Sequence, residues 1–315
     1  MRTTLDLPEA LMADATKDSH QKTRTAAMVM SWCHGVIGAA TLLLLLIAPG
    51  CRRAEEPVKP PPLATPGNEE TALPPGLLAY ERPDGVWVRE LPAGQPRRLV
   101  AEGRWARISP DGRLVAFLRK NEVRVVGVDT GAERLLASVG KGRALAWRPD
   151  GVEVWFTDDR RVRAVNVSNG VERVVVDGAL CLEIDAAADG RQLVATVKAL
   201  GGYRLRAWDL AGGRDWSLGH GCSASLDPEG RRVTNNLDGH RELALLDWAS
   251  GDRVGVVHAP AGVRFDNQFW SNHPDWIAAV TEGASRRVLL LHVPTDRAIF
   301  ATDEADCDRP DLAVR

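Results

Sequence analysis

The sequence predicts an all-β fold in which six blades, each a four-stranded antiparallel sheet, close into a ring behind a helical leader and a disordered linker. Three observations predict it. A unit of 39 residues is written twice in succession, from Arg104 and from Arg143; two kinds of turn recur at matching places in each copy; and the first copy lacks its opening strand. Repeats of this length built from short strands are typical of β-propellers.

Composition limits the function before any motif is considered. The chain has 315 residues, of which 44% are hydrophobic and 26% charged, so it can bury a sizeable core. Its formal charge of -2 argues against a broad basic face for nucleic acid. The five cysteines show no C-x-x-C spacing, which argues against a zinc ribbon. We predict neither a bound metal nor a cofactor.

Residues 1–27 form the first distinct segment, in which Thr3 to Leu7 alternate like a strand before a helix. The segment resembles the N-terminus of a VapB-type ribbon-helix-helix antitoxin. In that family the strand enters the DNA major groove, which implies that the readers here are Arg2, Thr4 and Asp6. An apolar run replaces the long second helix of that family, so we favour a segment without a DNA-binding function.

Residues 28–51 have the pattern of a signal peptide with a bacterial lipobox. The apolar run from Val36 to Pro49 is shorter than the roughly 20 residues of a membrane span but suits a signal-peptide core. It ends in LIAPGC, which resembles a lipobox and makes Cys51 the expected lipidation site. Two alternatives stay open: an uncleaved anchor from Ala26 to Ala48, and a buried helix. The proline-rich segment 52–75 then predicts an extended tether.

Residues 76–315 carry the repeats. The turn after the first strand of a copy contains Gly112, Gly151 and Gly190, which lie 39 residues apart, and Gly230 follows after 40. Glycine in such a turn supplies the positive φ that closes a hairpin. A second turn, between the third and fourth strands, recurs six times and predicts six blades. The blades are expected at 77–101, 104–137, 143–176, 181–218, 222–257 and 263–300.

The first blade is one strand short, because residues 77–101 match only the second to fourth strands of the later copies. Closed propellers commonly complete one blade with a strand from the opposite end of the chain, which removes the free sheet edges. We therefore expect Arg309 to Arg315 to supply the missing strand and close the ring.

The segments ISPDGRLVAF and WRPDGVEVWF resemble the WD40-like (PD40) repeats of six-bladed TolB-type propellers. The resemblance implies a bacterial periplasmic or cell-surface protein that acts through contacts rather than chemistry. It leaves the ligand open, since the same blades serve transport partners, peptidase gating domains and some hydrolases.

Three cysteines lie in the repeat region. Cys181 and Cys222 occupy nearly equivalent places at the start of neighbouring blades, where an oxidising compartment would allow a disulfide. Adjacent inner strands can exceed the ~4.4–6.8 Å Cα separation that a disulfide needs, so two buried thiols are the alternative. Cys307 is a further candidate partner for Cys222. His220 lies two residues before Cys222 without a third orienting group, and we predict no catalytic residue.

The sixth blade has the least repeat-like segment, 264–276, in which two residues are inserted at a turn. Insertions at such turns project to a propeller rim, where partners usually bind. The candidate rim-binding residues are Asn267, Trp270, Asn272 and His273.

The same segment has a metal-binding alternative. Asp266, Asn267, Asn272 and His273 offer ligand atoms, and further ligands would have to come from Glu183, Asp185 and Asn235–Asn236 on other inner strands. The inner strands share no acidic position, so capping of the turn by Asn and Asp is the favoured explanation.

We therefore expect a non-enzymatic, lipid-anchored propeller on the periplasmic or surface side of the cell envelope, which binds a protein or an envelope component as a monomer. Two alternatives stay open. One is a membrane-spanning regulator in which residues 1–27 bind DNA inside the cell and the propeller senses outside. The other is a metal-dependent propeller hydrolase.

Overall fold

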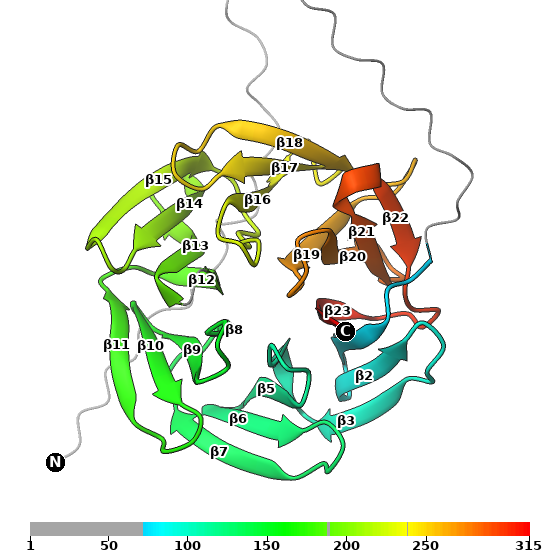
Figure 1. Ribbon diagram of the computed structural model, residues 1–315, viewed down its shortest axis with the longest axis horizontal. Coiled ribbons are helices and arrows are strands. Elements are labelled where there is room, and N and C mark those ends of the chain that lie inside the picture. Colours follow the sequence, from blue (N-terminus) through cyan, green and yellow to red (C-terminus); the bar gives the residue numbers. More distant parts are fainter. Residues whose placement is uncertain (1–71, 188–189, 238) are drawn as a thin grey trace, which may run out of the picture. The chain divides into compact units, whose positions relative to one another are not determined.

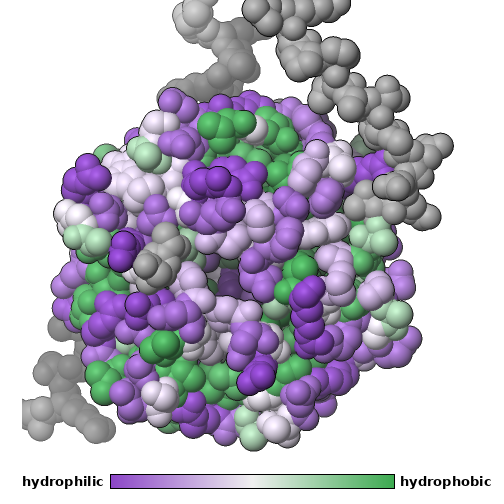
Figure 2. Space-filling view, viewed as in Figure 1, coloured by the Kyte–Doolittle hydropathy of each residue, from purple (hydrophilic) through white to green (hydrophobic). Residues whose placement is uncertain are grey.

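The computed structural model describes residues 72–187, 190–237 and 239–315. In Figure 1 the blades follow one another around a central axis in sequence order, and Figure 2 shows the surface hollowed at that axis. The segments predicted at 1–27 and 28–51, including Cys51, lie outside the described residues, as does most of the linker. Within the described residues, no helix is long and apolar enough to cross a membrane.

The first three blades are four-stranded antiparallel sheets. From the axis outward, blade 1 contains β23 (Asp308–Val314), β1 (Gly76–Arg82), β2 (Gly85–Leu91) and β3 (Arg97–Ala101). Blade 2 contains β4 (Arg104–Ile108), β5 (Leu114–Arg119), β6 (Glu122–Gly127) and β7 (Glu133–Ser138). Blade 3 contains β8 (Leu145–Trp147), β9 (Glu153–Asp158), β10 (Arg161–Asn166) and β11 (Glu172–Asp177).

The last three blades continue the ring. Blade 4 contains β12 (Cys181–Ala187), β13 (Gln192–Ala199), β14 (Gly202–Asp209) and β15 (Arg214–His220). Blade 5 contains β16 (Arg232–Leu237), β17 (Glu242–Asp247) and β18 (Arg253–His258). Blade 6 contains β19 (Phe265–Trp270), β20 (Trp276–Thr281), β21 (Val288–His292) and β22 (Arg297–Phe300), with the 3-10 turn η3 (Val293–Thr295) between the last two.

Blade 5 departs from the four-stranded pattern. Its innermost segment, residues 222–227, joins β16 through a single bridge between Leu226 and Val233. The Thr234 hydroxyl takes over part of the missing ladder, because it donates to the Ser223 carbonyl at 2.8 Å and accepts from the Ser225 N–H at 2.9 Å. The inner edge of this blade is therefore held partly by side chains.

The ring closes as predicted. Strand β23 pairs antiparallel with β1, so that Leu312 lies opposite Leu78. A clasp from blade 6 holds the same strand: the Asn272 side chain donates to the Val314 carbonyl at 3.0 Å and accepts from the Val314 N–H at 2.7 Å. Figure 1 shows β23 at the axis beside the first blade. The C-terminal segment thus completes blade 1 and joins it to blade 6.

The recurring turns have the geometry that their glycines predict. Gly112, Gly151, Gly190 and Gly230 have φ values of 72°, 71°, 78° and 71°, in the left-handed region that glycine reaches without steric cost. In the first of these turns the Gly112 N–H donates to the Ser109 carbonyl at 2.8 Å. These turns fix the register of the inner hairpins of blades 2 to 5.

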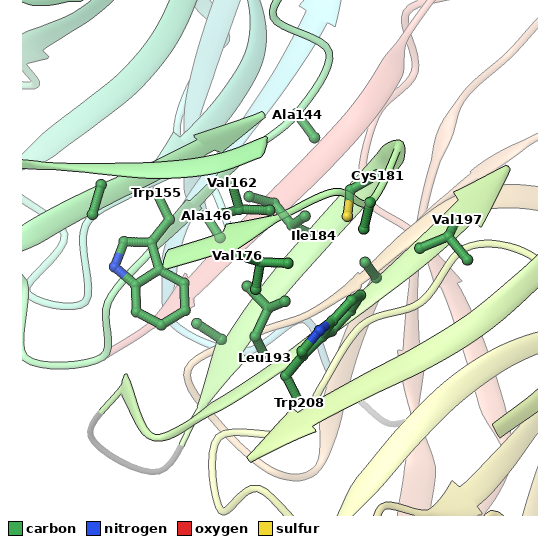
Figure 3. Packing of buried hydrophobic residues seen from close by; sticks show 14 residues of the cluster. Ala144, Ala146, Trp155, Val162, Val176, Cys181, Ile184, Leu193, Val197 and Trp208 are labelled. Atoms are coloured by element: carbon green, nitrogen blue, oxygen red, sulfur yellow. The ribbon is translucent and has the colours of Figure 1, made fainter. Parts of the chain in front are cut away.

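The core lies between the blades rather than within one of them. Six hydrophobic clusters each join two neighbouring blades, including one that joins blade 6 to blade 1. Figure 3 shows the cluster between blades 3 and 4, where Trp155 and Trp208 pack with Ile184, Leu193 and Cys181. Because each blade buries its faces against its neighbours, an open array would expose two of these faces to water.

Candidate functional site

A bulge near the start of the inner strands shapes the channel along the axis. Trp105, Ser223, Asn267 and Arg309 occupy similar places in four blades and have positive φ values of 56°, 60°, 49° and 40°. The register of β4 against β5 shifts at this point, as does that of β19 against β20. A bulge of this kind changes the direction in which side chains point. Three of these four residues, Trp105, Asn267 and Arg309, line the channel.

The mouth of the channel at the start of the inner strands, here called the start mouth, is basic. It is a cavity of about 500 Å³ whose cationic lining residues are Arg104, Lys141, Arg143 and Arg309. Arg309 is held in place, because its guanidinium lies 4.3 Å from the Trp105 ring centroid and 3.2 Å from Glu81.

The opposite end of the channel forms what we call the axial pocket, a cavity of about 340 Å³. The ends of the inner strands and the turns that follow them line it. Its apolar wall includes Pro110, Trp147, Pro149, Pro228, Phe269 and Trp270, which come from blades 2, 3, 5 and 6. A partner that enters this pocket would therefore contact most of the ring at once.

Arg107 is the most unusual residue of the axial pocket. It is only 5% exposed, yet its Nη2 has no hydrogen-bond partner in the structure. The guanidinium stacks on the ring of Phe269 from blade 6, with Cζ 3.3 Å from the centroid, and Nη1 donates to the Ala106 carbonyl at 2.9 Å. A buried donor without an acceptor costs about 1–3 kcal/mol, so this group favours a ligand that supplies an oxygen.

Two carboxylates share the pocket with Arg107: Asp311 is buried and Asp185 is half-buried. Asp185 accepts hydrogen bonds from the Ser225 hydroxyl at 2.5 Å and from the Leu226 and Ala186 N–H groups, while burial raises its pKa to about 6. Asp311 accepts from the Ile108 N–H at 2.6 Å, and burial raises its pKa while Arg107 lowers it. Both carboxylates join inner strands of different blades, so they stabilise the channel wall.

The four predicted rim residues do not form one surface. Trp270 and Asn272 line the axial pocket, whereas Asn267 lines the start mouth and donates to Asp308 at 2.7 Å. Asn272 is engaged by the closing strand, and His273 caps its own turn by accepting from the Asp275 N–H at 3.2 Å. Two of the rim candidates, Trp270 and Asn272, line the axial pocket, whereas Arg107 was not among the candidates.

The metal set proposed for the sixth blade does not converge. Asp266 and Asn267 lie near the start of β19, whereas Asn272 and His273 lie beyond its end, about 20 Å along an extended strand. A different set, which shares only Asp266 with the first, does converge near the start mouth: the ligand atoms of Cys222, His240 and Asp266 all lie within 4.8 Å of one another. Sequence reasoning had considered Cys222 and Asp266 separately and had not considered His240.

The structure has Cys181, Cys222 and Cys307 as free thiols, so the possible disulfide between Cys181 and Cys222 is not formed in it. The Cys181 side chain is fully buried in the apolar cluster between blades 3 and 4. The Cys222 sulfur instead lies 4.0 Å from His240 Nε2. Burial, followed by the charges of Asp266 and Glu183, raises the pKa of Cys222 to about 11, which opposes a free nucleophilic thiolate.

No protein-family model matches the chain, and no curated protein sequence does. Solved structures match its fold. TolB from Acinetobacter baumannii aligns with a TM-score of 0.60 at 14% identity, over 76% of this chain and 67% of that chain. A chain of the nidogen/laminin complex aligns with a TM-score of 0.62 at 11% identity, over 76% and 98%.

A protein from Agrobacterium tumefaciens described as a TolB aligns with a TM-score of 0.58 at 11% identity, over 78% of this chain and 99% of that chain. At these identities the likeness shows the fold alone. The chain has a TolB-like, six-bladed β-propeller fold.

Proposed function

We propose that this protein is a non-catalytic binding module that holds a segment of a partner protein in the axial pocket. The observation that carries the proposal is Arg107, a buried guanidinium with an unpaired Nη2 among apolar side chains of several blades. A peptide segment offers what this pocket lacks: an apolar side chain to cover the aromatic and proline wall, and a carbonyl or carboxylate oxygen to accept from Nη2.

The remaining polar groups of the pocket support binding rather than chemistry. Asp185 already accepts three hydrogen bonds from the protein, one on Oδ1 and two on Oδ2, which hold it in the channel wall. Asp311 is likewise bound to a backbone N–H of the next blade. The likeness to a chain from the nidogen/laminin complex agrees with a propeller of this size taking part in a protein complex.

Photocrosslinking in the organism of origin tests this function. A photoreactive residue at Pro149 lines the axial pocket, and a matched one at Val174, 52% exposed on β11 of the same blade, faces away from it. We expect one protein adduct from position 149 and none from position 174. Adducts from 174 alone, or an adduct pattern that does not distinguish the two positions, would contradict the proposal.

The location is a second part of the proposal. We infer a lipid anchor at Cys51, with the propeller on the extracytoplasmic side of the membrane and acting as a monomer. The support is the apolar run before LIAPGC and the proline-rich tether after it. Mass spectrometry of the mature N-terminal peptide tests it: a lipidated peptide that begins at Cys51 is expected. A mature chain that retains residues 1–50 would contradict the anchor and would favour the membrane-spanning regulator.

A further inference from the structure

Blades 5 and 6 bring three side chains with metal-binding chemistry together near the start mouth. Cys222 opens the inner segment of blade 5, His240 lies in the hairpin between β16 and β17, and Asp266 lies in β19 of blade 6. Their ligand atoms lie within 4.8 Å of one another, and the Cys222 sulfur is 4.0 Å from His240 Nε2. All three are partly exposed, so an ion can reach them from solvent.

Hydrogen bonds from outside the cluster orient His240. Its Nδ1 is bonded to a Glu282 carboxylate oxygen, which leaves Nε2 facing Cys222. Glu282 is itself held by Arg264, whose Nε lies 3.1 Å from the other carboxylate oxygen. A carboxylate on the far nitrogen of a histidine is the usual support of a metal-binding imidazole, because it sets the tautomer and raises the basicity of the ligand nitrogen.

Asp266 is oriented in the same way. Its Oδ1 accepts from the Ser223 hydroxyl at 3.0 Å and from the Asn236 side-chain amide at 3.0 Å, which leaves the second oxygen for an ion. Glu183 adds a further carboxylate beside the cluster, since it accepts from the Ser223 N–H at 2.8 Å. The surroundings of Cys222 are therefore rich in negative charge, which favours a bound cation.

We propose that Cys222, His240 and Asp266 bind a zinc ion. A tetrahedral zinc with bonds of ~2.0–2.3 Å needs its ligand atoms roughly 3.5 Å apart, so the cluster has to contract only slightly. One thiolate and one imidazole select zinc over calcium and magnesium, which prefer oxygen ligands alone. The three side chains leave the fourth position of the ion to water.

The site lies where the ring is least regular. Residues 222–227 form a single bridge with β16, at Leu226, and one further backbone hydrogen bond joins the Asn236 N–H to the Cys222 carbonyl at 3.3 Å. Ser223 next to Cys222 has a φ of 60°. A metal ion bound by blades 5 and 6 together would connect this inner segment to its neighbour without a backbone ladder. Zinc therefore acts here as a cross-link between two blades, independently of what the axial pocket binds.

Cobalt binding to the full reduced chain tests the proposal, because a cobalt–thiolate bond gives a charge-transfer absorption band. We expect the band to saturate at one equivalent of Co²⁺ and to disappear when Zn²⁺ displaces it. The band should be lost in Cys222→Ser, and the affinity should fall at least tenfold in His240→Gln and in Asp266→Asn. The matched control is His220→Gln, two residues from Cys222, which should bind as the wild type does.

A measurement on the unmodified protein keeps the test independent of whether the variants fold. Zn²⁺ should slow alkylation of the Cys222 peptide by iodoacetamide at least tenfold, as read by peptide mapping, and Ca²⁺ should not. Absence of this protection in a protein whose Cys222 is reduced overturns the proposal. A charge-transfer band that survives in Cys222→Ser also overturns it, since the thiolate would then come from another cysteine.

Discussion

Because the C-terminal strand closes the ring, we expect substitution of Leu312 to lower the stability of the protein strongly. Its side chain is 2% exposed and packs in the cluster between blades 6 and 1, opposite Leu78. Truncation of such a buried leucine costs about 2–5 kcal/mol, through lost transfer energy and the cavity that remains. In a domain of this size, 1 kcal/mol corresponds to roughly 2–4 °C in the melting temperature, so Leu312→Ala should melt about 4–20 °C lower.

Thermal and urea unfolding of the full chain measure this effect. The matched control is Leu135→Ala, because Leu135 is also a strand leucine but is 47% exposed on the outer strand β7. Its expected cost is within about 0.5 kcal/mol. Equal stability of the two variants would refute the closed ring as the source of stability. If the C-terminal segment did not pair with blade 1, a cavity at Leu312 would not destabilise the propeller.

The other predictions concern the Asn272 clasp, the carboxyl group of Asp185 and a crowded glycine. Asn272→Ala should cost about 1–2 kcal/mol and speed hydrogen exchange at the Val314 amide, because both hydrogen bonds to Val314 are lost; unchanged exchange there would argue against the clasp. Burial raises the pKa of Asp185 from 3.8 to about 6, so the folded protein keeps a proton that the unfolded chain releases. This contribution to stability is lost as pH rises through about 6; urea melts should show Asp185→Asn gaining up to about 3 kcal/mol relative to wild type between about pH 4 and 7, and a parallel pH profile would count against it. An added Cβ at Gly85 would lie 2.1 Å from the Val100 carbonyl oxygen, whereas at Gly131 it would meet nothing within 4 Å. Since both glycines have positive φ, Gly85→Ala should lose about 1–3 kcal/mol more than Gly131→Ala in urea melts, and equal losses would contradict the crowding.

The repeats made the architecture predictable because each turn carries its own chemical signal. Gly112 and its counterparts need a positive φ, so Asp-Gly marks a hairpin wherever it recurs. The missing strand before Leu77 pointed to the C-terminal segment, and the pairing of β1 with β23 confirms that inference. Both arguments depend on local geometry, which a short stretch of sequence specifies.

The axial pocket was less predictable because the inner strands are bulged. Strict alternation along β4 would place Arg107 on the same face as Trp105, but the register shifts between Arg104 and Arg107. Arg107 lines the axial pocket and Trp105 the start mouth. In the sequence, Arg107 has the pattern of an ordinary polar strand residue and Trp105 that of an ordinary aromatic one.

The zinc cluster was hidden for a different reason. Cys222, His240 and Asp266 lie on three separate elements, and only the packing of blade 6 against blade 5 brings them together. One signal was present: His240 takes the left-handed hairpin position that Lys120 and Asp159 take in earlier blades, with φ values of 69°, 54° and 55°. A histidine at that repeat position is a departure that an alignment of the blades would expose.

The affinity of the crosslinked partner for the Arg107→Lys variant tests the central claim most directly. Lysine keeps a cation beside Asp185 and Asp311 but removes the unpaired Nη2 and the plane that stacks on Phe269. We expect binding at least tenfold weaker, because a hydrogen bond from a charged group is worth about 1.5–3 kcal/mol and each 1.4 kcal/mol is tenfold in affinity. Arg104→Lys at the start mouth should bind as the wild type does. Unchanged affinity in Arg107→Lys, or an equal loss in both variants, would show that the partner does not bind in the axial pocket.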